Sequence, residues 1–207
     1  MDIRESYDSA AQAYAENLST ELEHKPLDRH LLNRFAEAVQ SRGRVADLGC
    51  GPGHIAGYVR ERGVDVLGID LSPEMVRVAA SLHPGGDFRV GDMKRLDLPS
   101  GSLAGVLSFY SIVHFPIAEL GPVVHEIRRV LAPDGLALIA FHVGTDVVRV
   151  EDLFGAPVSL DFRFHVPQEI VRELQLAQLS VIEHVEREPY EGAEYPSRRC
   201  YLLARAV

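Results

Sequence analysis

Short apolar stretches alternate with amphipathic ones through the middle of the chain, and this alternation limits the fold more than any other feature. Stretches rich in Val, Ile and Leu occupy residues 44–49, 64–70, 87–92, 103–110 and 135–141. Helical patterns follow three of them, at 53–62, 73–82 and 117–131, and a short turn or helix is expected near 94–98. Strands that alternate with helices pair in parallel, with both faces of the sheet covered. The pattern therefore predicts an α/β protein.

The two ends of the chain follow different patterns. Apolar residues at helical intervals predict helices over 5–20 and 28–40, with Asp28 as the cap of the second. Residues 142–166 are expected to be loop-like with short β-type runs, and Pro167 opens a helix to about Gln178. Two final strands are expected at 180–188 and 198–207.

These elements predict a doubly wound, Rossmann-like fold with helices on both faces of one mixed sheet. The five repeats and the two terminal strands predict seven strands in the order 3-2-1-4-5-7-6, with strand 7 antiparallel. At 207 residues the chain is long enough for one domain with a substantial core and short for two. We therefore expect residues 1–207 to form a single domain.

The composition favours a small molecule over nucleic acid as the partner. The formal net charge is −9, and basic pairs such as Arg128-Arg129 and Arg198-Arg199 are scattered along the chain. No apolar run approaches the roughly 18 residues that a membrane span needs. The two cysteines, Cys50 and Cys200, offer neither a disulfide framework nor a metal spacing. We expect a cytoplasmic monomer or homodimer that binds no metal, membrane or nucleic acid.

A glycine-rich turn follows the first expected strand. In "VADLGCGPG" three glycines, Gly49, Gly51 and Gly53, come just after Asp47, and Asp70 ends the next strand. Such a turn lets the backbone approach a ligand closely, and an acid at the end of the second strand binds ribose hydroxyls. Both dinucleotides and S-adenosylmethionine are compatible with this turn and this acidic residue. A dinucleotide site needs a small third residue where this chain has His54, so the pattern favours S-adenosylmethionine.

The chain resembles the class I S-adenosylmethionine-dependent methyltransferases, in particular the small single-domain type. The resemblance runs from about Tyr7 to Phe141 and rests on five motifs in order: "YDSAAQAYAENL", "VADLGCGPG", "GIDLSPEMVRVA", "VGDMKRLDLPSGSLAGVLSFYSIVHF" and "EIRRVLAPDGLALIAF". The last sixty or so residues match only in pattern. Gln178-Leu179 stands where the family often has Gly-Phe.

The resemblance implies a role for each matching residue of a cofactor site. Asp47 would hold the cofactor's amino group through water, and Asp70 would accept from both ribose hydroxyls. The backbone from Gly49 through Cys50 to Gly51 would pass beneath the methionine part. Leu71 and Met75 would flank the adenine, Asp92 would bind its amino group, and Met93 would cover the other face of the ring. The Ser108 carbonyl would accept a hydrogen bond from the cofactor's ammonium group. Tyr14 and, as a second candidate, Tyr7 would close the site from the N-terminal helix.

Each of these residues also has an ordinary structural interpretation. Asp47 and Asp70 could be turn or cap residues, Asp92 could merely end a strand, Met75 could be core, and the tyrosines could be helix-packing aromatics. For the acceptor side, His114 follows the fourth strand and is the candidate catalytic base, with pocket lining or simple packing as alternatives. His142, and His165 with Arg163, could also face the pocket.

The resemblance implies methyl transfer by in-line displacement to a small acceptor, at oxygen or nitrogen, with S-adenosylhomocysteine as the product. Residues 1–30 are expected to form a helical lid, and 142–166 an insertion that contributes to the acceptor pocket. Two alternatives remain open: a non-catalytic S-adenosylmethionine-binding protein and a nicotinamide-dependent oxidoreductase. The second is disfavoured by His54 and by the lack of a Tyr-x-x-x-Lys pair.

Overall fold

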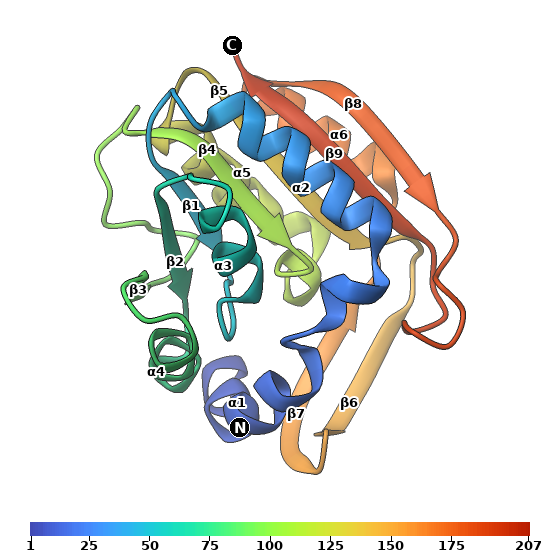
Figure 1. Ribbon diagram of the computed structural model, residues 1–207. Helices are drawn as coiled ribbons and strands as arrows, with labels where there is room; N and C mark the ends of the chain where they lie inside the picture. Colours follow the sequence, from blue (N-terminus) through green and yellow to red (C-terminus); the bar gives the residue numbers. More distant parts are fainter.

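Seven strands form one mixed sheet in the order β3-β2-β1-β4-β5-β9-β8, as seen in a computed structural model that describes residues 1–207 (Figure 1). Neighbouring strands from β3 to β5 are parallel, and β9 is antiparallel to both of its neighbours. This is the predicted order, with β9 and β8 as the predicted strands 7 and 6. The strands are β1 (Val45–Leu48), β2 (Val66–Asp70), β3 (Asp87–Val90), β4 (Leu103–Phe109), β5 (Leu131–His142), β8 (Leu179–Arg187) and β9 (Arg199–Ala206).

Helices cover both faces of the sheet (Figure 1). One core packs α2 and α3 on one face, and a second core packs α5 and α6 on the other. Successive strand residues point to opposite faces, so Leu138 of β5 joins the first core and Ile139 the second. A strand that is buried on both faces has a nearly continuous apolar sequence, and for this reason these strands could be predicted from the sequence. The helices are α1 (Ile3–Leu18), α2 (Pro26–Val39), α3 (His54–Arg60), α4 (Pro73–Leu82), α5 (Ile117–Val130) and α6 (Pro167–Leu176), with short 3₁₀ turns η1 (Glu21–His24) and η2 (Ile112–His114).

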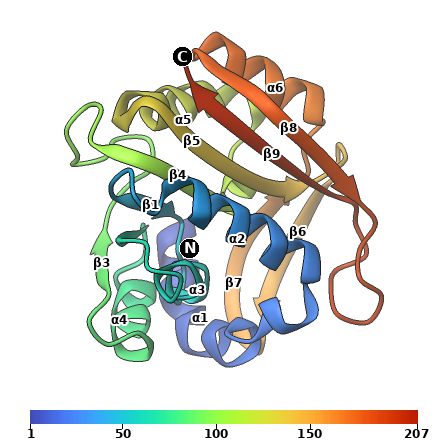
Figure 2. The same ribbon diagram turned by 45° about the horizontal axis from the view of Figure 1, so that its top comes forward.

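Residues 142–166, predicted to be loop-like, contain a second sheet. Strands β6 (Val147–Leu153) and β7 (Ala156–Arg163) form an antiparallel hairpin that reaches away from the main sheet to α1 (Figure 2). Its apolar side chains, Val158 and Leu160, pack on Ala10 of α1. The hairpin depends on this packing, because two short strands alone are barely stable in water. The segment 94–98 is a turn and contains no helix.

Asp28 does not cap α2, which is a correction to the sequence prediction. The helix begins at Pro26, so Asp28 lies in its first turn and is buried, with 1% of its surface exposed. Its carboxylate accepts hydrogen bonds from the Tyr201 hydroxyl (2.8 Å) and from Arg187 (2.9 Å). A short acid near a helix start usually acts as a cap, and only the arrival of β8 and β9 gives it a different partner.

Arg187 binds two buried carboxylates and ties β8 to α2 and to the loop before β9. Besides Asp28 it donates to both oxygens of Glu194, at 2.6 and 2.8 Å. Burial alone would raise the pKa of Glu194, but hydrogen bonds from Arg187 and from the Tyr190 N–H lower it to about 2. Burial raises the pKa of Asp28, and Tyr201 and Arg187 oppose that rise. The guanidinium therefore compensates part of the negative charge in this part of the core, together with Lys25 and Arg199, which lie 3.6 and 3.9 Å from Glu194.

We expect Arg187→Met to lower the free energy of unfolding by about 3–5 kcal/mol at pH 7, because two buried carboxylates lose their common partner. Arg34→Met is the matched control, since Arg34 also pairs α2 with β8, through Glu183, but half of its side chain is exposed. The control should lose less than about 1 kcal/mol. Urea unfolding of both variants measures the difference, and equal losses would contradict the assigned role.

The same variants should differ in their pH dependence. In the parent, the lowered pKa of Glu194 adds stability above the carboxyl's ordinary pKa, and that stability is lost as the pH falls toward 2. Without Arg187 the pKa values of both carboxyls rise, and protonation relieves the buried charge. The difference in the free energy of unfolding between the parent and Arg187→Met should therefore become smaller as the pH falls from 7 to 5.

Candidate functional site

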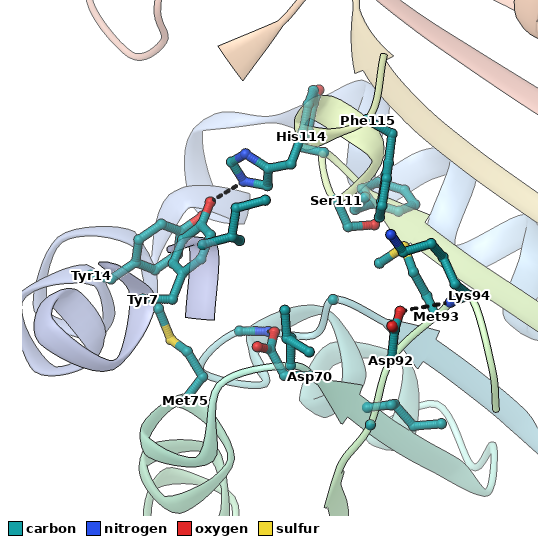
Figure 3. A pocket seen from close by; sticks show the side chains of 18 residues that line it. Tyr7, Tyr14, Asp70, Met75, Asp92, Met93, Lys94, Ser111, His114 and Phe115 are labelled. Atoms are coloured by element: carbon teal, nitrogen blue, oxygen red, sulfur yellow. Dashed lines mark hydrogen bonds between the residues drawn. The ribbon is translucent and has the colours of Figure 1, made fainter. Parts of the chain in front are cut away.

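A cavity opens at the carboxyl ends of β1, β2 and β4 and is closed over by α1 (Figure 3). The chain leaves β1 toward β2 and β3 and then returns to β4 on the other side, so the connections diverge here. Ligands of open α/β sheets bind at such a switch point. The lining residues are Ile3, Tyr7, Tyr14, Gly49, Gly51, Ile69, Asp70, Leu71, Met75, Gly91, Asp92, Met93, Lys94, Phe109, Tyr110, Ser111, His114 and Phe115.

Asp70, the last residue of β2, presents an oriented carboxylate to the cavity. One oxygen accepts from the Gly51 N–H (2.8 Å) and the other from the Ser72 N–H (2.9 Å). Burial raises the pKa of Asp70, and these backbone donors oppose the rise. Each carboxylate oxygen accepts more than one hydrogen bond. The remaining lone pairs are therefore available to a ligand that offers two hydroxyls.

The glycine turn lies against the segment that follows β4. Gly49 has φ +71°, and a Cβ placed on it would lie 2.4 Å from the Cβ of Ser111. Its N–H and that of Cys50 both donate to the Ile69 carbonyl, at 2.8 and 3.1 Å, which holds the turn on β2. Gly49 is thus required by both its conformation and its neighbour. On the cavity side the turn meets the ring of Tyr14, 3.9 Å from an added Gly51 Cβ.

Three of the predicted cofactor residues lie behind the cavity wall. Asp47 is 1% exposed, and its Oδ2 has no hydrogen-bond partner in the protein. Burial raises the pKa of this carboxyl to about 7. The Cys50 thiol is buried, and the Ser108 hydroxyl is 2.7 Å from that of Ser111. The roles implied for them are a water-mediated contact for Asp47, a backbone contact for Cys50 and a carbonyl contact for Ser108. All three stay predictions.

The other predicted cofactor residues lie together around the cavity (Figure 3). Leu71 is 40% exposed at its edge, whereas Met75 is buried and also packs against α1. Asp92 accepts the Lys94 N–H at 2.8 Å through one oxygen, which leaves the other directed at the cavity. Met93 lies near Gly49, with its Cε 3.4 Å from an added Cβ. The tertiary structure therefore brings together polar and apolar groups from four separate motifs.

His114 lies on η2, and both of its ring nitrogens are engaged. Nε2 is 2.7 Å from the Tyr7 hydroxyl, and Nδ1 is 3.1 Å from the Asp161 carbonyl on β7. The ring also packs against Phe162, with 5.1 Å between the ring centroids. Burial lowers the pKa of His114 to about 4, so the ring is neutral near pH 7. Whether it has a catalytic role stays a prediction.

Two other histidines and one arginine considered from the sequence do not line this cavity. His142 stacks on Phe164 and is 2.7 Å from the Ser197 hydroxyl. His165 is buried, with Nε2 3.3 Å from the Ile112 carbonyl. Arg163 is 3.3 Å from the Asp161 carboxylate on its own strand. Each is engaged in holding the segments after β5.

The structure adds cavity residues that the sequence analysis did not single out. Tyr110, directly after β4, has φ +54°, and its hydroxyl is 3.0 Å from that of Tyr201. A positive φ is rare for a bulky residue and tends to mark a functional or tightly constrained position. Lys94 brings a cation to the wall, 5.3 Å from the centre of the Phe115 ring. The segment "SFYSIVHF" was expected at the acceptor side from the sequence, but Tyr110 was not singled out within it.

The observed groups fit S-adenosylmethionine. An orphaned buried oxygen on Asp47 needs a hydrogen-bond donor, and leaving it unpaired costs about 1–3 kcal/mol. A glycine turn that a Cβ would obstruct and a carboxylate preset by two N–H groups suit a nucleoside.

Fold and cavity together describe an α/β protein with a cavity at the switch point of its sheet, lined by groups that suit a nucleoside-type ligand. Comparison with known proteins narrows this class. A family described as "Methyltransferase domain" matches residues 45–135. The chain is 31% identical over 137 residues to the malonyl-[acyl-carrier protein] O-methyltransferase of Yersinia pestis, covering 66% of this chain and 46% of that protein.

A second relative and a solved structure agree with this match. The magnesium-protoporphyrin O-methyltransferase of Rhodobacter capsulatus is 30% identical over 111 residues, covering 47% of this chain and 49% of the relative. An S-adenosylmethionine-dependent methyltransferase of Methanosarcina mazei has the same fold, with a TM-score of 0.73 and 17% identity over 83% of this chain and 95% of the other. Over residues 45–135 the chain thus matches the methyltransferase domain family, and its fold is that of an S-adenosylmethionine-dependent methyltransferase of known structure. The chain spans about half the length of these two curated relatives.

We expect Asp70→Ala to weaken binding of S-adenosylhomocysteine at least tenfold. The change removes two hydrogen bonds to a charged acceptor, each worth roughly 1.5–3 kcal/mol. Affinity of the parent should also fall as the pH drops through the raised pKa of Asp70, because the ionised form binds the hydroxyls. Isothermal calorimetry measures both, with Asp87→Ala on β3 as the control. Unchanged affinity in a folded Asp70→Ala protein would place the ribose elsewhere.

We expect Gly49→Ala to be much more harmful than Gly101→Ala. Both glycines have positive φ, +71° and +66°, but nothing lies within 4 Å of a Cβ added to Gly101. Gly101→Ala should cost about 1–2 kcal/mol for the left-handed backbone alone. Gly49→Ala should cost a further 1–3 kcal/mol or so, since Ser111 must move. Urea unfolding measures both variants. Equal losses in the free energy of unfolding would show that Ser111 moves away from the turn at no cost and would contradict the prediction.

Proposed function

We propose that the chain transfers the methyl group of S-adenosylmethionine to a small-molecule acceptor, at oxygen or nitrogen. One observation carries the proposal: the cavity has a second wall that no predicted cofactor contact uses. Tyr110, Ser111, His114 and Phe115 form it after β4, and Ile3 of α1 closes it. A protein that only bound the cofactor would not need this additional space.

When bound, S-adenosylmethionine supplies a methyl group on a positively charged sulfur, ready for displacement by a nucleophile. Asp70 would hold the ribose hydroxyls, and the backbone of Gly49, Cys50 and Gly51 would support the methionine part. Asp47 and the Ser108 carbonyl would hold its ammonium group. The adenine would lie among Leu71, Met75, Asp92 and Met93. These groups bind and orient the cofactor and leave the second wall to the acceptor.

Positioning is the main contribution expected from the chain's own residues. Bringing two reactants into line can supply roughly 7–11 kcal/mol of the barrier. The rings of Tyr7 and Tyr14 cover the cavity from α1, and they pack edge to face with centroids 6.1 Å apart. We infer that residues 1–30 act as a lid and that the segment 142–166 supports the acceptor side. Its β7 carbonyl at Asp161 holds His114, although no side chain of the hairpin lines the cavity.

Both curated relatives are named as O-methyltransferases, which favours oxygen over nitrogen; the malonyl group in the first name offers a carboxylate oxygen, so carboxylic acids belong in the acceptor panel. A non-catalytic S-adenosylmethionine-binding protein remains the alternative, because the cofactor half of the cavity would be the same. A nicotinamide-dependent oxidoreductase loses support through the family assignment. No helix is long and apolar enough to cross a membrane. A cytoplasmic location and a monomeric or homodimeric state stay predictions.

The decisive experiment measures formation of S-adenosylhomocysteine by the purified protein with a panel of alcohols, phenols, amines and carboxylic acids. We expect acceptor-dependent turnover in the parent and a loss of at least tenfold in Asp70→Ala at subsaturating cofactor. Cofactor affinity is measured in parallel by calorimetry. Tight binding without turnover on any acceptor would favour the non-catalytic alternative, and tighter binding of NADH would contradict the proposed class.

A further inference from the structure

The hydrogen bonds around His114 determine which atom carries the proton. A carbonyl oxygen only accepts, so the 3.1 Å contact with Asp161 requires a proton on Nδ1. A neutral imidazole then has a lone pair on Nε2. The Tyr7 hydroxyl, 2.7 Å from Nε2, must therefore donate its proton to His114. Figure 3 shows this pair at the edge of the cavity.

This arrangement leaves the Tyr7 oxygen with unused lone pairs. Its only hydrogen bond in the protein is the one donated to His114, and Tyr7 lines the cavity. A hydroxyl whose proton is already committed can only accept further hydrogen bonds. The acceptor wall thus presents a hydrogen-bond acceptor, where a free tyrosine could also donate.

We propose that Tyr7 contacts the methyl acceptor and selects one that carries its own O–H or N–H, namely an alcohol, a phenol or an amine. A carboxylate offers only lone pairs and would face the lone pairs of Tyr7. This inference rests on the proposed function and names its substrate class. His114 is then a positioning residue, because it acts through Tyr7.

The surroundings of His114 keep it in this protonation state. Asp161 and Arg163 of β7 are the charged groups whose fields act on the ring, and Tyr7 of α1 faces it. The Asp161 carboxylate is paired with Arg149 (3.0 Å) and Arg163 (3.3 Å), so it gives the ring only its backbone carbonyl. Burial and the charge of Arg163 both oppose an imidazolium. A neutral ring with Nδ1–H is the consequence.

Tyr7 and His114 provide a route for the proton that the transfer step releases. The acceptor O or N attacks the methyl carbon, a C–O or C–N bond forms, and the S–CH₃ bond breaks with its electron pair left on sulfur. The acceptor's proton passes to the Tyr7 oxygen, and the Tyr7 proton passes to Nε2 of His114. The imidazolium, disfavoured by its burial, returns the proton to solvent as the products leave.

The proton position is tested first, without any activity. In protein labelled with ¹⁵N-histidine, long-range ¹H–¹⁵N spectra distinguish the two neutral tautomers, and His114→Gln assigns the signal. We expect the Nδ1–H tautomer, with S-adenosylhomocysteine bound, from pH 8 to pH 5. An Nε2–H tautomer would overturn the proposal, because Tyr7 would then donate into the cavity. This readout does not depend on turnover, so it separates failure of the proposal from failure of the proposed function.

The acceptor class is tested with benzyl alcohol, benzylamine and benzoate, a matched series of turnover substrates. We expect Tyr7→Phe to lower turnover of the alcohol and the amine by about 10²-fold or more, since the proton loses its route. Tyr58→Phe is the control, because its hydroxyl bonds only Asn33, far from the cavity, and it should be unchanged. Faster turnover of benzoate than of the alcohol in the parent would overturn the proposal.

Two changes at His114 separate positioning from packing. His114→Gln supplies an amide oxygen that accepts the hydrogen bond of Tyr7 but cannot take its proton, so it should keep the parent's KM for the alcohol while turnover of the alcohol falls about 10²-fold. His114→Leu frees that proton, and the ratio of alcohol to benzoate turnover should fall at least tenfold. A purely structural histidine would lower the rates of both substrates by one common factor in the two variants, and that result would contradict the proposal.

Discussion

The hydrogen bonds that hold the half-buried Asp70 carboxylate at the end of β2 are the interaction on which the organisation of the site depends. A charge removed from water must be compensated by donors, and here Gly51 and Ser72 supply them through their backbones. Ser72 also caps α4, since its oxygen accepts the Met75 N–H, and its hydroxyl donates to Asp8 of α1 at 2.6 Å. The half-buried Asp70 carboxylate and its donors therefore connect the glycine turn, β2, α4 and the helix that covers the cavity.

The opposite wall depends on a different set of buried polar groups. Tyr110 lines the cavity in a left-handed conformation, and its hydroxyl meets that of Tyr201, which in turn donates to Asp28. Asp28 shares Arg187 with Glu194. The position of an aromatic ring at the acceptor side is thus linked to ion pairs between α2, β8 and the loop before β9. Polar networks of this kind specify a unique arrangement only when they are well satisfied.

The order of the main sheet was predictable because its rules are local and repeated. Continuous apolar strands, a proline after the Ser72 cap and right-handed crossovers leave few alternatives. Short β-type runs were expected in residues 142–166 but not their pairing as the hairpin of β6 and β7, because nothing in this segment requires a second sheet. Its formation depends on α1, where Ala10 is small enough to admit Val158 and Leu160. Asp28 was misassigned for a related reason, since its partners come from strands that are distant in the sequence.

The class of fold and the residues proposed for the cofactor could be predicted from the sequence, because those residues lie at fixed offsets from strand ends. A glycine turn after β1 and an acid after β2 are placed by the geometry of neighbouring parallel strands. The wall proposed for the acceptor could not be predicted in this way, because its side chains meet only in the folded chain. Tyr7 is 107 residues from His114, and Asp161 is 47 residues away on the other side. No local pattern encodes which nitrogen of His114 carries a proton, since α1 and β7 supply the partners that settle it.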